Sequence, residues 1–139
     1  MGQSTDANLY YGIQFDEDFP PPGKEEDLDW EEFYAMRMGL PPIEAPYGNE
    51  TKEMYSKYWE LKRKLVENSV CKIGMHCSCD YPMYYVCIGK SETRASRGYP
   101  KVIKNLEVEP NWDNTLREFC GLMGLKYEQP QWWLSSMWC

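Results

Sequence analysis

Alternating apolar and polar positions near the start of the chain predict a β-strand with one buried face. Over residues 8–15 every second side chain is apolar, at Leu9, Tyr11, Ile13 and Phe15. The run Pro20-Pro21-Pro22-Gly23 then ends regular pairing, because proline lacks the backbone N–H that a sheet uses.

Capping residues and helical spacing predict two helices next. Asp29 can cap the first helix, with Glu32 three residues on, and Gly39 with Pro41-Pro42 ends it after Leu40. The second helix is predicted over 51–68, because its apolar residues recur every three or four positions. They are Met54, Tyr58, Leu61 and Leu65, with Tyr55, Trp59 and Val66 widening the stripe.

The second half of the chain has the composition of a sheet. Strands are predicted over 70–77, 83–88 and 93–97, then a helix over 113–123 with Gly124 as its C-cap. A short strand is predicted over 125–127, and the aromatic tail 130–139 should be ordered. We therefore expect one α+β domain over 1–139, a mostly antiparallel sheet with two or three helices packed on it.

Acidic and basic residues are concentrated in different parts of the chain. The net charge is −7; residues 1–50 carry twelve acidic and two basic side chains, and residues 51–104 carry five and eleven. The acidic part can pair with the basic middle inside the molecule, or the two can form surfaces of opposite sign that meet a partner.

Membrane and secretion signals are missing from the sequence. It has no run of eighteen apolar residues and no basic, then apolar, N-terminal region, so we expect no membrane contact and no secretory signal. Without such a signal, the six cysteines are expected to be reduced thiols.

Two sets of residues are candidates for binding. The acidic set, for contact with a protein, is Asp16, Glu17, Asp18, Glu25, Glu26, Asp27 and Trp30. The basic and aromatic set, for an anion or nucleotide, is Arg94, Arg97, Tyr99, Lys101, His76 and Asp80. Each set can instead be an ordinary solvated face. The negative net charge argues against duplex nucleic acid as a partner.

The densest group of ligand-type residues is His76-Cys77-Ser78-Cys79-Asp80. Structural zinc uses paired Cys-x2-4-Cys units, and no second pair follows. Neighbouring strand residues also face opposite ways, which separates His76 from the Cys77 thiol. We therefore predict no metal, no cofactor and no enzymatic activity.

Several segments together resemble a family of small acidic proteins that tailed bacteriophages and prophages encode. They are YGIQFDEDF at 11–19, WEE at 30–32, HCS at 76–78, DYPM at 80–83, RGYP at 97–100 and WWLSSMW at 132–138. Cys79 and Cys139 depart from the family's pattern. The family has no assigned activity, and the resemblance implies expression in the cytoplasm of a bacterial host.

These observations lead to one expected function and two alternatives. We expect a non-enzymatic phage accessory protein that binds and inhibits a host or defence protein, for example a CRISPR effector, through its acidic and aromatic surface. The first alternative is a protein that binds a nucleotide or signalling ligand, or a small hydrolase, working at the basic and aromatic edge. The second is a role in virion assembly.

Overall fold

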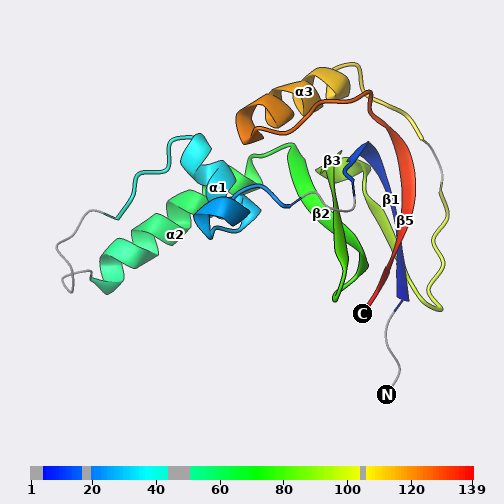
Figure 1. The fold of residues 1–139 in the computed structure, drawn as a ribbon, viewed down its shortest axis with the longest axis horizontal. Coiled ribbons are helices and arrows are strands. Elements are labelled where there is room, and N and C mark those ends of the chain that lie inside the picture. The colour runs from blue at the N-terminus through cyan, green and yellow to red at the C-terminus, as the bar shows by residue number, and fades with distance from the viewer. Residues whose placement is uncertain (1–4, 17–19, 44–50, 104–105) are drawn as a thin grey trace. The chain divides into compact units, whose positions relative to one another are not determined.

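The computed structural model describes residues 5–16, 20–43, 51–103 and 106–139, which form the elements of Figure 1. The strands are β1 (Thr5–Gln14), β2 (Cys71–Ser78), β3 (Pro82–Ile88), β4 (Thr93–Ser96) and β5 (Gln131–Trp138). The helices are α1 (Trp30–Arg37), α2 (Lys52–Glu67) and α3 (Trp112–Met123), with short 3-10 turns η1 (Lys24–Glu26) and η2 (Gly89–Ser91).

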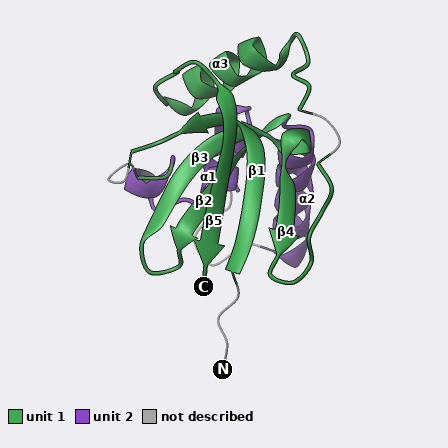
Figure 2. Ribbon diagram, turned by 90° about the vertical axis from the view of Figure 1, so that its right-hand side faces the viewer, with its two compact units in different colours: residues 1–21, 70–139 green, residues 22–69 purple. Residues whose placement is uncertain are grey.

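The chain divides into two compact units, drawn in green and purple in Figure 2. Unit 1 contains residues 1–21 and 70–139, and so holds all five strands and α3. Unit 2 contains residues 22–69, with α1 and α2. In the sequence, unit 2 is therefore an insertion between β1 and β2.

The predicted α+β class is confirmed. The five strands form a single mixed sheet in the order β3-β2-β5-β1-β4, and every ladder is antiparallel except the short one between β2 and β5. The strand predicted over 93–97 forms as β4 (Thr93–Ser96), and it pairs not with the β2–β3 hairpin but with the first half of β1, with Asp6 opposite Ser96 and Leu9 opposite Thr93.

The sheet closes on itself through β1. Besides its ladders with β4 and β5, β1 pairs over residues 12–14 with β3. Since β3 also pairs with β2, and β2 reaches β5, the strands β1, β3, β2 and β5 form a closed ring of ladders. Gly12 permits the close approach, because a Cβ there would lie 1.9 Å from the carbonyl oxygen of Val86.

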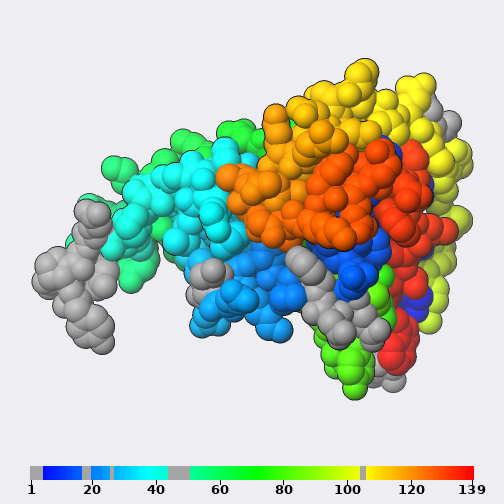
Figure 3. Space-filling model, turned by 45° about the horizontal axis from the view of Figure 1, so that its top comes forward, coloured from blue at the N-terminus to red at the C-terminus, as the bar shows by residue number. Residues whose placement is uncertain are grey.

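Helix α3 packs on β2 and β3 across one end of the sheet. Its buried face carries Leu116, Phe119, Cys120 and Met123, as the sequence pattern predicted. Gly124 ends the helix in a left-handed conformation (φ 71°), and the Leu125 amide donates back to the Cys120 carbonyl at 2.8 Å. Figure 3 brings this end forward and shows α3 and the segment after it as gold and orange surface.

The predicted Asp29 is the N-cap of α1, and Thr51, where the second helix was predicted to begin, is the N-cap of α2. The Asp29 carboxylate accepts from the Glu32 amide at 2.7 Å, and the Thr51 hydroxyl accepts from the Met54 amide at 3.2 Å. The aromatic tail forms β5, which confirms that it is ordered. The strand predicted over 125–127 is wrong: these residues follow the helix cap as irregular chain.

Candidate functional site

A groove in unit 2 is a concave surface that this unit supplies by itself. One part, of about 350 Å³, is lined by residues of α1, α2 and the segment between Leu40 and Ile43. They are Glu32, Met36, Leu40, Pro42, Ile43, Tyr55, Tyr58 and Trp59. A second hollow continues it past Pro42, Ile43 and Tyr58 to Met54 and Leu61. The volume is enough for a few large side chains.

Helical periodicity places these residues side by side. Glu32 and Met36 stand one turn apart on α1, and Tyr55, Tyr58 and Trp59 lie three and four residues apart on α2. Tyr55 is 44% exposed and Trp59 is 52% exposed. The apolar stripe of α2 thus presents large aromatic side chains to solvent, although such groups are usually buried.

Polar contacts hold the aromatic rings of the groove in place. The Tyr58 hydroxyl donates to the Glu32 carboxylate at 2.7 Å, which ties α2 to α1. Burial and this carboxylate raise the pKa of Tyr58 to about 12. The Lys62 ammonium stands 4.4 Å from the centre of the Trp59 ring and 3.9 Å from the Asp29 carboxylate. The groove therefore has fixed walls and a carboxylate at its edge.

The residues predicted for protein binding lie in both units. Asp16 is exposed at the end of a described stretch of unit 1, while Glu25 and Asp27 are exposed in unit 2. Trp30 is half-buried at the start of α1. Glu17 and Asp18 lie outside the described residues, as does the side chain of Glu26. Of the predicted set, Glu25, Asp27 and Trp30 belong to the same unit as the groove.

A buried polar network lies on the sheet of unit 1. The Asn8 side-chain amide donates to the Tyr85 hydroxyl at 2.6 Å and to the Glu92 carboxylate at 2.8 Å. Tyr85 and the Lys72 ammonium donate to the same carboxylate at 3.0 and 2.6 Å. Burial alone raises the pKa of Glu92, but the hydrogen bonds from Lys72 and Asn8 outweigh it and leave that pKa below its usual value.

Next to this network, the aromatic side chains of two buried tyrosines of the sheet stack on each other. The rings of Tyr10 and Tyr85 are nearly parallel, with centres 3.8 Å apart, and both residues are fully buried with Cys87. Burial raises the pKa of Tyr10 to about 12 and that of Tyr85 further. The Glu92 carboxylate thus accepts hydrogen bonds from Asn8, Lys72 and Tyr85, as partly buried carboxylates usually do.

The predicted anion-binding residues are divided between two places. Arg94 is exposed on β4, and Arg97, Tyr99 and Lys101 are exposed in the segment after it. His76 is half-buried on β2, where its Nε2 contacts the Gln14 amide and burial lowers its pKa. Two strands, β5 and β1, separate β2 from β4 in the sheet, and Asp80 lies in the turn after β2.

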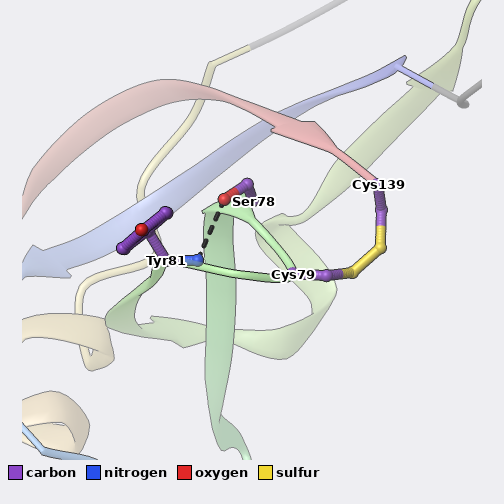
Figure 4. The surroundings of a disulfide bond; sticks show 4 residues. All are labelled: Ser78, Cys79, Tyr81 and Cys139. Carbon is purple, nitrogen blue, oxygen red and sulfur yellow. Dashed lines mark hydrogen bonds between the residues drawn. A yellow bond between two sulfur atoms is a disulfide. The ribbon is translucent and has the colours of Figure 1, made fainter.

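The prediction that all six cysteines are reduced is wrong for two of them. Cys79, in the β2–β3 turn, and Cys139, after β5, form a disulfide (Figure 4). Sequence spacing cannot reveal this pairing, because Cys79 and Cys139 are 60 positions apart and six cysteines allow many connectivities. Within the described residues, no group of three His, Cys, Asp or Glu side chains could hold a metal ion.

Comparisons with protein-family models, curated proteins and solved structures found no match to this chain. Among the described helices, none has the length and apolar character needed to cross a membrane. The resemblance to phage proteins therefore stays a prediction.

The groove was only partly visible in the sequence. The sequence places Tyr55 and Trp59 in an apolar stripe, and helical spacing alone does not say how much of that stripe a neighbouring element covers. One sequence feature could have indicated the groove. The apolar face of the second helix includes Tyr55 and Trp59 beside Met54 and Tyr58, so it is wider than one neighbouring helix usually covers. The polar network gave no local signal, since Asn8 and Glu92 are 84 positions apart.

Proposed function

We propose that the protein is a non-enzymatic phage accessory protein that binds and inhibits a host or defence protein, and that unit 2 carries the binding surface. One observation supports this most: the groove between α1 and α2, with Tyr55 and Trp59 exposed at its edge. Exposed aromatic residues beside an apolar hollow are typical of protein interfaces, where they dominate the binding energy.

The charge beside the groove indicates the chemistry of the partner. Glu32 lines it, Glu31 is exposed next to Glu32 on α1, and Glu25 and Asp27 are exposed earlier in the same unit. A complementary partner segment places apolar side chains in the groove and lysine or arginine side chains against these carboxylates. A CRISPR effector, with its basic nucleic-acid channel, is one example of such a partner.

The anion-binding alternative has weaker support, since two strands separate His76 from Arg94 in the sheet. A virion assembly role remains an alternative, and stable self-association of the purified chain would favour it.

The proposal is tested by capture with the tagged full chain from bacterial lysate, with and without nuclease, followed by mass spectrometry. Trp59→Ala and Tyr55→Ala remove groove aromatics, and Tyr81→Ala, an exposed tyrosine of unit 1, is the matched control. We expect one host protein, recovered equally after nuclease treatment, with the wild type and Tyr81→Ala. Trp59→Ala should reduce its recovery by at least about tenfold.

A second set of variants tests the role of the acidic residues. Reversing Glu25, Asp27 and Glu31 to lysine should weaken capture of the same protein and make it less sensitive to salt. Equal capture by the wild type and the groove variants, or no stoichiometric partner at all, would overturn the proposal.

A further inference from the structure

The Cys79–Cys139 disulfide stands at the shortest ladder of the closed ring of strands. β2 and β5 are paired only through Cys77 with Met137 and Ser78 with Trp138, in the parallel sense. β1, by contrast, pairs with β5 along the whole of β5. The disulfide continues the parallel register by one residue, joining positions 79 and 139 with their Cα atoms 5.4 Å apart.

We call this short β2–β5 ladder the seam. Apart from its two register pairs and the disulfide, few interactions among the described residues join these strands. Cys77, Cys79 and Cys139 are all exposed, so a reagent in solution reaches the bridge. Cys77 has a left-handed backbone (φ 78°), a conformation that costs a residue other than glycine free energy. In the turn itself, the Tyr81 amide donates to the Ser78 hydroxyl at 3.0 Å, a bond within the turn that does not reach β5 (Figure 4).

The rest of the ring does not depend on the bridge. β5 is held by β1 from Thr5 opposite Trp138 to Gly12 opposite Gln131, and β2 is held by β3 from Cys71 to Cys77. Cleavage of the disulfide therefore frees only the β2–β5 ladder. It leaves β5 paired with β1, and β2 paired with β3. This makes the bridge a local closure rather than a cross-link on which the whole sheet depends.

We propose that Cys79 and Cys139 form a redox-operated latch, which closes the ring of strands when oxidised and opens the β2–β5 seam when reduced. The reductant is a dithiol. One of its thiolates attacks a sulfur of the bridge, and its second thiol resolves the mixed disulfide. The dithiol gives up two electrons and two protons and becomes a disulfide, while Cys79 and Cys139 become two thiols. Closure is the reverse exchange: a disulfide accepts two electrons and two protons from Cys79 and Cys139 and becomes a dithiol. In a reducing cytoplasm the seam is open, and in an oxidising compartment it is closed.

Hydrogen exchange of the full chain, followed by mass spectrometry, tests the latch. We compare the air-oxidised protein with the same protein in dithiothreitol. The amides within residues 77–82, where Pro82 has none, and within residues 137–139 should exchange at least about tenfold faster after reduction, while those of residues 5–12 should be unchanged. Cys79→Ala with Cys139→Ala should reproduce the reduced pattern without reductant, and Cys77→Ser should keep the oxidised pattern.

Each other result rejects the latch. Unchanged exchange at 77–82 and 137–139 would mean that the seam holds without the bridge. Faster exchange throughout unit 1 would mean that the bridge is a general stabilising cross-link. Six reactive thiols in the denatured, air-oxidised protein, or a bridge that contains Cys77 by peptide mapping, would show that the pairing itself does not form.

Discussion

The ring of Tyr85 fills the space that a side chain at Gly74 would need. The two residues are register partners on β3 and β2, and a Cβ on Gly74 would lie 2.1 Å from the ring Cζ and 2.3 Å from the hydroxyl oxygen. Glycine at this position therefore lets the buried tyrosine lie flat across the neighbouring strand, where it stacks on Tyr10 and reaches Asn8.

Gly74→Ala should strongly destabilise the protein. The Tyr85 ring must move to admit the new methyl group, which disturbs both its stacking and its hydrogen bonds, so we expect a loss of about 2–4 kcal/mol in the free energy of unfolding. Urea denaturation measures it. Gly121→Ala is the control, because a Cβ there meets no atom within 4 Å and α3 should gain up to about 1 kcal/mol. Similar stability of both variants would contradict the packing described for Tyr85.

Glu92 should make the free energy of unfolding depend on pH in the acidic range. Its folded-state pKa is below the value of about 4.3 of an unfolded glutamate, so its ionised form stabilises the fold above that pH. This contribution is lost as the pH falls through the folded-state pKa. Since the Glu92 side chain is only 14% exposed, Glu92→Gln should cost about 1–3 kcal/mol at pH 7 and flatten the acid dependence below pH 5.

Glu109→Gln is the matched control for that experiment. Glu109 also pairs with a lysine, Lys90, but both side chains are about half exposed, so the change should stay within about 0.5 kcal/mol. Denaturation curves between pH 3 and pH 7 separate the two. An equal effect of both substitutions would show that the network around Glu92 does not form as described.

The stacked tyrosines should resist ionisation at high pH. The pKa of Tyr10 is raised to about 12 and that of Tyr85 further, chiefly by burial, so their protonated forms stabilise the fold below pH 10. This stability is lost as the pH rises above the unfolded-state value of about 10. Absorbance at 295 nm should show part of the eleven tyrosines ionising only when circular dichroism reports unfolding. Complete ionisation near pH 10 with a native spectrum would refute this.

Thiol reactivity should distinguish three classes of cysteine: one exposed thiol, three buried thiols and two in the disulfide. Cys77 is exposed, whereas Cys71, Cys87 and Cys120 are buried; burial raises the pKa of Cys71 to about 12 and that of Cys120 to about 11. We expect one fast-reacting thiol in the native oxidised protein, four after denaturation, and six after denaturation and reduction. Cys77→Ser should remove the fast-reacting thiol and leave the other counts lower by one.

The parts of the fold that could be predicted from the sequence are those with local causes. Asp29 and Thr51 cap their helices because the cap needs only a side chain and an amide three residues away. The alternation at Leu9 to Phe15 correctly predicted a strand, but the prediction of one buried face is wrong: Asn8 and Tyr10 on the other face are buried, because other strands and residues far along the chain cover them. The partners of each strand could not be predicted in this way, since no residue near Leu9 indicates that it pairs with Leu134.

The candidate site was less predictable because burial depends on neighbours that are distant in sequence. Trp59 has the spacing of a buried helix residue, and only the packing of α1 and α2 shows that it stays exposed. Lys72 and Glu92 look like ordinary surface charges, yet they meet in a partly buried network with Asn8. The acidic residues were visible in sequence, but not their division between the two units.

The central position of β1 has a consequence for how the chain folds during synthesis. β1 is synthesised before its longest partner, β5, and the register partners Leu9 and Leu134 are 125 positions apart. Until then, one edge of β1 has unsatisfied backbone donors and acceptors, the kind of edge that promotes aggregation. Residues 22–69 can form α1 and α2 during this delay, since their contacts are local in sequence. Completion of the ring therefore waits until β5 has been translated, and one edge of β1 stays unpaired during this interval.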